Sequence, residues 1–135
     1  MLIQGPLLIC RRSGGILPRV ENGNLDRRVP MDPARIDAWL RARVCVGGRP
    51  DWLFVKLYTH GCADRNLDFF FGGPAADLHA RLCEHYNDGH RYRLHYVTAR
   101  EMYNAVRAAE RGLSGNPAEY RDLEIGPPPG AANRK

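Results

Sequence analysis

The sequence predicts an α/β fold in which three to four parallel strands alternate with three helices, as in a partial (β/α) barrel. Two observations support this prediction. Segments rich in aromatic and β-branched residues alternate with segments whose apolar residues recur every three to four positions. In addition, residues 52–58 are apolar almost throughout, which is typical of a strand buried on both faces of a parallel sheet. A complete barrel of this type has about eight strands, so we expect less than half of one here.

The expected strands are short and lie between turn-forming residues. We expect them at residues 2–9, 52–58, 91–97 and 120–125, of which the last is the weakest. Residues 10–31 are rich in glycine, proline and asparagine and show no periodicity, so they predict a long loop.

The first predicted helix begins at Asp32-Pro33, since Asp is a good N-cap residue and Pro suits the first helical position. Its apolar face has four-residue spacing: Ile36, Leu40 and Val44. A glycine pair at 47–48 predicts its end.

Two further helices follow. The second is expected from Pro74 to the turn that begins at Asn87. The third begins at a capping box, in which the side chains of Thr98 and Glu101 each accept a hydrogen bond from a backbone amide of the first turn. It is expected to end at Gly112.

The length of 135 residues fits one compact domain. We expect a single α/β domain over residues 1–125 and a disordered tail over residues 126–135. No apolar run approaches the roughly 18 residues of a membrane span, so none is expected. No signal peptide is recognisable, which makes a cytoplasmic location the default unless an N-terminal part is missing.

The net charge of +5 comes from the first part of the chain. Residues 1–50 contain nine Arg and four acidic residues, whereas residues 51–135 contain eleven residues of each sign. The arginines are spread over a loop and an amphipathic helix with few aromatic residues between them. A nucleic-acid partner is therefore not expected.

Candidate site residues lie in the loops after the expected strands, because parallel α/β folds bind ligands there. His60 follows the second strand, and an imidazole can act as general acid or base near neutral pH. Glu21 and Asn22 lie in the long first loop, and Arg100 lies at the start of the third helix. Each of these residues also has a purely structural interpretation. His60 could do no more than form a hydrogen bond within its loop, and Asn22-Gly23 is a common turn sequence. Arg100 could simply be a solvated residue of the helix.

Several kinds of site lack their motif. The sequence contains no P-loop, no G-x-G-x-x-G and no G-x-S-x-G motif. The remaining histidines are spaced by 6, 5 and 5 residues, which does not place two of them on one helix face: His79, His85, His90 and His95. We therefore expect no metal ligands on this chain. Cys62 lies two residues after His60, which we attribute to coincidence in a shared loop.

Five segments together resemble one protein family. They are residues 5–7, 17–23, 54–61, 86–89 and 92–104. Over about residues 2–125 the chain is similar to the C-terminal portion of bacterial proteins related to polysaccharide deacetylases, which belong to the glycoside hydrolase/deacetylase barrel superfamily. The resemblance implies a distorted (β/α) barrel that acts on acylated or polymeric carbohydrate.

The same resemblance implies roles for individual residues. His60 matches the family's general-acid histidine at the end of a late strand, although Tyr58-Thr59 replace the usual apolar pair before it. The family's general-base Asp, and its metal site of one Asp and an H-x-x-x-H pair, have no counterpart here. The divalent, zinc-like metal would then belong to the complete barrel, with no cofactor on this chain.

Two functions remain open from the sequence. In the first, the chain is the C-terminal part of a carbohydrate-active, polysaccharide deacetylase-like enzyme and is not catalytically competent alone. His60 would donate a proton, while Glu21, Asn22 and Arg100 would shape the sugar-binding site. Uncovered strand edges would favour self-association. In the second, a small non-catalytic module binds a polyanion or a protein partner through its arginine-rich first 50 residues.

Overall fold

The computed structural model describes residues 1–11, 15–27, 32–60 and 64–130. The chain divides into two compact units. Unit 1 comprises Met1–Ile3, Cys45–Phe54 and His95–Lys135, and unit 2 comprises Gln4–Val44 and Val55–Leu94. The expectation of one domain over residues 1–125, with a disordered tail after it, stays a prediction.

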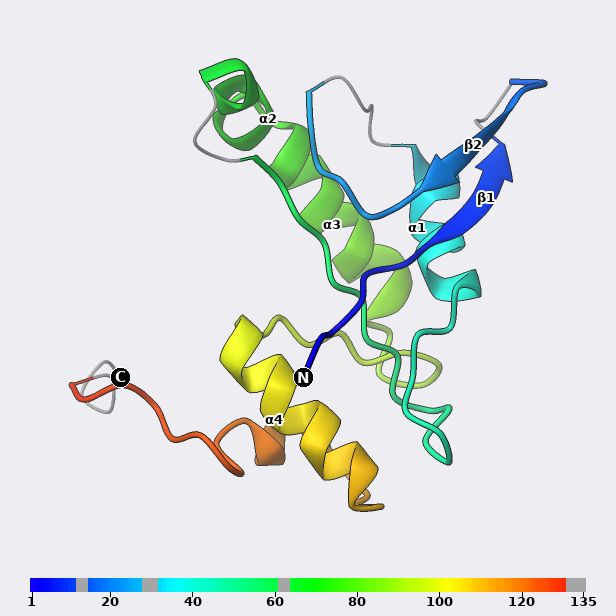
Figure 1. The fold of residues 1–135 in the computed structure, drawn as a ribbon. Coiled ribbons are helices and arrows are strands. Elements are labelled where there is room, and N and C mark those ends of the chain that lie inside the picture. Colours follow the sequence, from blue (N-terminus) through cyan, green and yellow to red (C-terminus); the bar gives the residue numbers. More distant parts are fainter. Residues whose placement is uncertain (12–14, 28–31, 61–63, 131–135) are drawn as a thin grey trace. The chain divides into compact units, whose positions relative to one another are not determined.

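Unit 2 contains a β-hairpin and three helices (Figure 1). In the hairpin, β1 (Leu8–Arg11) and β2 (Pro18–Glu21) pair in antiparallel orientation, and α1 (Pro33–Arg41) packs against both strands. The other two helices pack against each other: α2 (Leu67–Phe71), after a 3₁₀ turn at Asp64–Asn66, and α3 (Pro74–Tyr86).

The core of unit 2 joins α1 to α3. Ile36 and Trp39 of α1 are buried together with Leu78 of α3. Val55 and Leu57, from the extended segment that precedes the 3₁₀ turn, pack against this cluster. The hydrophobic contacts therefore tie an otherwise irregular segment to the helices.

Unit 1 is built around α4 (Ala99–Glu110), which is followed by a 3₁₀ turn at Pro117–Tyr120. Ala108 and Ala109 of α4 form a small core with Trp52. The ring of Tyr120 lies against Trp52, with the two ring centroids 5.9 Å apart.

The predicted partial (β/α) barrel with parallel strands is wrong. The described residues contain one two-stranded antiparallel sheet, and parallel pairing is limited to an isolated bridge between Asn24 and Tyr58. The first expected strand is displaced to β1. Its partner β2 lies within residues 10–31, which were expected to form only a loop.

Residues 52–58 illustrate why the strand prediction failed. Trp52 and Phe54 belong to the core of unit 1, whereas Val55 and Leu57 belong to the core of unit 2. The segment is apolar because it contributes to two different cores, and not because both faces of a strand are covered.

In the other two expected strands, backbone groups form hydrogen bonds with side chains and not with a neighbouring strand. At residues 91–97, the Asp88 carboxylate accepts from the amides of Arg91 and Tyr92, and Asn87 Oδ1 accepts from the Leu94 amide. At residues 120–125, backbone groups bond to side chains of α4. Since these groups are already paired, they do not form a ladder with another strand.

All three predicted helices are present as α1, α3 and α4. Asp32 caps α1 by accepting a 3.0 Å hydrogen bond from the Ala34 amide, and Thr98 and Glu101 form the expected capping box on α4. However, α1 ends at Arg41, well before the glycine pair, and Arg43 adopts a positive φ of 44°. Among the described residues, none of the helices has the length and apolar character needed to cross a bilayer.

Candidate functional site

Glu21, the last residue of β2, is completely buried and lies at the centre of a polar cluster. Arg35 of α1 donates from Nε to Glu21 Oε2 at 2.8 Å and from Nη2 to Oε1 at 3.0 Å. Trp39 Nε1 donates to Oε1 at 3.0 Å, and Arg19 Nη2 donates to Oε2 at 2.9 Å. The Gly23 amide also donates to Oε1, at 3.0 Å. The carboxylate thus joins the hairpin to α1 and to the loop after β2.

These donors determine the ionisation of the carboxyl group. Burial by itself would raise the pKa of Glu21, but the hydrogen bonds from Arg35, Trp39 and the Gly23 amide, with the positive charge of Arg35, lower the pKa to about 2. Glu21 is therefore charged at neutral pH. Its contacts make it a positioning residue for the loop, and direct contact with a substrate stays a prediction.

The turn after Glu21 is compact. Asn22 is exposed, and its Oδ1 accepts from the Asn24 amide at 3.1 Å, as in an Asx turn. Gly23 has a φ of 75°, and a Cβ atom at this position would lie 3.0 Å from the carbonyl oxygen of Lys56. Glycine is needed here both for the positive φ and for the close approach to the neighbouring segment. Asn22 is held at the surface by this turn.

The same turn is hydrogen-bonded to the segment that ends at His60. The Leu25 amide donates to Tyr58 O at 2.7 Å, and the Tyr58 amide donates to Gly23 O at 3.1 Å. The His60 carbonyl accepts from Asn66 Nδ2 at 3.0 Å. The His60 side chain is exposed, and its ring meets the Tyr58 ring edge to face at a centroid distance of 6.2 Å. The backbone of His60 is thus fixed while its imidazole faces solvent.

Asn66 is a residue that the sequence did not single out. It is fully buried at the end of the 3₁₀ turn, and its Oδ1 accepts a 3.4 Å hydrogen bond from the Arg27 amide. The same side chain therefore connects the segment after Asn24 to His60. In the sequence, Asn66 begins a segment whose pattern fits neither a helix nor a strand, and this position is the signal that could have identified it.

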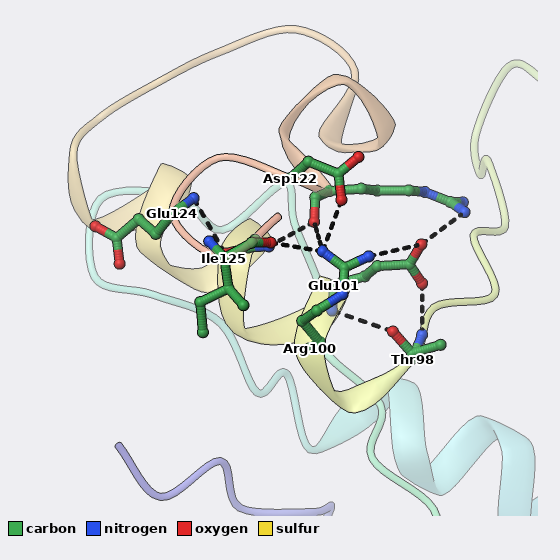
Figure 2. A network of polar contacts seen from close by, with 8 residues as sticks. Thr98, Arg100, Glu101, Asp122, Glu124 and Ile125 are labelled. Atoms are coloured by element: carbon green, nitrogen blue, oxygen red, sulfur yellow. Dashed lines mark hydrogen bonds and ion pairs between the residues drawn. The ribbon is translucent and has the colours of Figure 1, made fainter. Parts of the chain in front are cut away.

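Arg100 belongs to unit 1, apart from the other three candidates, which belong to unit 2. Figure 2 shows its guanidinium reaching from the first turn of α4 to residues 121–125. Nη1 donates to Asp122 Oδ1 at 2.6 Å and to the carbonyl oxygens of Arg121 and Ile125 at 3.1 and 2.6 Å. The side chain is engaged in holding the chain after the 3₁₀ turn, and its predicted contact with sugar stays a prediction.

Asn104, one turn further along α4, holds the same segment and was also missed from sequence. It is fully buried, and its Nδ2 donates to the carbonyl oxygens of Arg121 and Ile125. Its Oδ1 accepts from the amides of Glu124 and Ile125 at 3.2 and 3.1 Å. The side-chain amide of Asn104 therefore pairs with backbone groups of residues 121–125 that a neighbouring strand would otherwise have paired.

Metal ligation has no candidate in the described ranges 1–11, 15–27, 32–60 and 64–130. No group of three or more His, Cys, Asp or Glu side chains there could hold an ion. Within those ranges the side chains therefore offer no ligand set for the divalent metal that the family resemblance implies. Cys62, considered above with His60, lies outside the described residues.

Comparisons with protein families, with curated proteins and with solved structures gave no match to this chain.

Proposed function

We propose that this chain is the C-terminal part of a carbohydrate-active, polysaccharide deacetylase-like protein and that His60 is its proton donor. The observation that carries the proposal is an exposed imidazole on a hydrogen-bonded backbone. Tyr58 is bonded to the turn at Gly23, and the His60 carbonyl is bonded to Asn66. A general acid must keep a defined position while its ring nitrogen reaches the substrate. The bonded backbone and the Tyr58 ring contact support the first requirement, and the exposure of the imidazole supports the second.

In this proposal Glu21 and Asn22 shape the sugar-binding surface of unit 2. Glu21 fixes the turn through the Gly23 amide, and the turn presents the exposed Asn22 side chain. An amide side chain can both donate to and accept from sugar hydroxyls. In unit 1, Arg100 orders residues 121–125. The substrate class, an acylated carbohydrate, comes from the sequence resemblance.

The chain is proposed to be catalytically incomplete. In metal-assisted deacetylation a divalent cation polarises the acyl carbonyl and activates water. We propose that its ligands and the general base belong to a part of the enzyme outside this chain. The chemistry assigned here is limited to His60, which would hold a proton on its imidazole and deliver it to the leaving group.

The alternative, a polyanion-binding module, has less support because several arginines of the first 50 residues are paired internally. Arg19 and Arg35 bind the Glu21 carboxylate. Arg49 binds Asp51 at 2.8 Å, and its guanidinium stacks over the Trp52 ring. These side chains stabilise the fold through their contacts within the protein.

The proposal is tested by nuclear magnetic resonance titration of the chain with an N-acetylated chito-oligosaccharide. We expect shifts at residues 22–25 and 58–60, and about fivefold weaker binding in His60→Ala, which loses one hydrogen bond to the sugar. His90→Ala is the matched control, because His90 is an exposed histidine of the same unit and its backbone amide is already bonded to Asp88.

Three results would contradict the proposal. The first is the absence of chemical-shift changes in both segments. The second is equal affinity of His60→Ala and the parent chain for the oligosaccharide. The third is a loss of affinity in His90→Ala as large as the loss in His60→Ala. Deacetylase activity of the chain with zinc that is unaffected by His60→Ala would also exclude His60 as the proton donor.

A further inference from the structure

The hairpin of unit 2 exposes an apolar face. Side chains alternate along the strands, so Cys10 and Glu21 are buried on the side that faces the protein. On the other side, Ile9 is 76% exposed and its cross-strand partner Val20 is 60% exposed. Leu7, two residues before Ile9, is also exposed. In an antiparallel sheet with one solvated face, the solvated residues are normally polar.

The most exposed apolar residues of the hairpin lie between its strands. Ile16 and Leu17 directly precede β2 and have 88% and 81% of their surfaces exposed. With Leu7, Ile9 and Val20 they form what we call the hairpin patch. An apolar surface of this kind on one hairpin is typical of a region that contacts a partner or a membrane.

The charge around the hairpin patch is positive. Residues 1–20 contain no acidic residue and three arginines, of which Arg19 is paired with Glu21 on the opposite face of the hairpin and adds no charge to the hairpin patch. Arg11 is exposed and occupies the outward register of β1 with Ile9. A second copy of the chain would bring like charges together, whereas an anionic surface would complement them.

We propose that the hairpin patch docks onto the surface of an anionic lipid bilayer. Ile16 and Leu17 enter the interfacial layer, and Arg11 lies at the level of the lipid phosphates. A fluid lipid layer fits around two adjacent projecting side chains without a preformed pocket, whereas a protein partner would need a complementary one. This location at a membrane goes beyond the proposed carbohydrate chemistry and does not depend on it.

The test is co-sedimentation of the chain with phosphatidylcholine vesicles that either contain or lack phosphatidylglycerol. We expect binding to the anionic vesicles that weakens as salt rises. The double variant Ile16→Ser/Leu17→Ser should bind at least about tenfold more weakly, since two large apolar side chains leave the lipid. Arg11→Gln should bind about fivefold more weakly, as expected for one basic residue near an anionic surface.

Phe71→Ser is the matched control, because Phe71 is 85% exposed but lies on α2, outside the hairpin patch. It should bind vesicles as the parent does. Circular dichroism and the urea midpoint confirm that each variant is folded. Absence of binding to anionic vesicles overturns the proposal. A loss of vesicle binding in Phe71→Ser as large as that in Ile16→Ser/Leu17→Ser overturns it as well. A dimer in analytical ultracentrifugation that Ile16→Ser/Leu17→Ser dissociates would assign the hairpin patch to a second copy instead.

Discussion

Replacing the buried carboxylate of Glu21 by an amide, in Glu21→Gln, tests the interaction that joins the hairpin to α1. The variant keeps the size of the side chain but removes its charge. It also places an amide NH₂ group among donors, because Arg35, Trp39 and the Gly23 amide all donate to this side chain. The buried Arg35 guanidinium would lose its anionic partner.

The expected loss of stability is about 3–4 kcal/mol at neutral pH. The pKa of Glu21 is lowered from its ordinary value of 4.5 to about 2, and each pKa unit corresponds to about 1.4 kcal/mol. Removal of one partner from a buried ion pair costs about 3–5 kcal/mol, which is of the same order.

The direction of the pKa shift determines how the stability difference between the parent chain and Glu21→Gln changes with pH. Because the pKa is lower in the folded state than in the unfolded state, the carboxylate stabilises the fold fully above about pH 5. That contribution is lost as the pH falls from about 4.5 to about 2. The difference in unfolding free energy between the parent chain and Glu21→Gln should therefore decrease over this interval.

The measurement is urea denaturation of the parent, Glu21→Gln and Glu84→Gln at a series of pH values. Glu84 is an exposed glutamate on α3, so its substitution should change stability by less than about 0.5 kcal/mol. A loss below about 1 kcal/mol in Glu21→Gln, or a difference that does not change with pH, would refute the reasoning.

Three other substitutions test separate parts of the structure, each by urea denaturation. Asn104→Ala should destabilise unit 1 by about 2–4 kcal/mol, since it leaves backbone groups of residues 121–125 without partners, and the Glu124 and Ile125 amides should exchange faster. Unchanged exchange there would argue against the contacts of Asn104. Thr98→Ala should cost about 1 kcal/mol through loss of the α4 cap, whereas Thr98→Ser should be near neutral. Gly23→Ala should cost about 1–3 kcal/mol because of its positive φ and the close Lys56 carbonyl, and a neutral result would mean that this turn has another conformation.

The starts of three of the described helices, α1, α3 and α4, were determined by local sequence, whereas α2 was not predicted. Asp32 accepts from an amide two residues away, and Thr98 and Glu101 bond to each other's backbones. Such contacts depend only on residues within one turn, so a local pattern is enough to predict them. The starts of α1, α3 and α4 at Pro33, Pro74 and Ala99 agree with this reasoning.

The candidate site was predicted only in part. The sequence identified His60 as a residue at the end of an apolar segment. It lies there, two residues after Tyr58, whose backbone is bonded to the turn at Gly23, and its own carbonyl accepts from Asn66. The sequence did not show that the Glu21 carboxylate is enclosed by Arg35 and Trp39 of α1. Those donors lie 14 and 18 residues away, and no periodicity brings them to a particular carboxylate.

Strand pairing and core membership were decided only by the tertiary structure. An apolar segment such as residues 52–58 specifies burial but not its partner, and here it is divided between two cores. Backbone groups at residues 91–97 and 121–125 bond to the side chains of Asp88, Asn87 and Asn104, which satisfy them as a neighbouring strand would. Local sequence therefore determined where α1, α3 and α4 begin, whereas long-range hydrogen bonds and packing determined that the intervening segments form no parallel sheet.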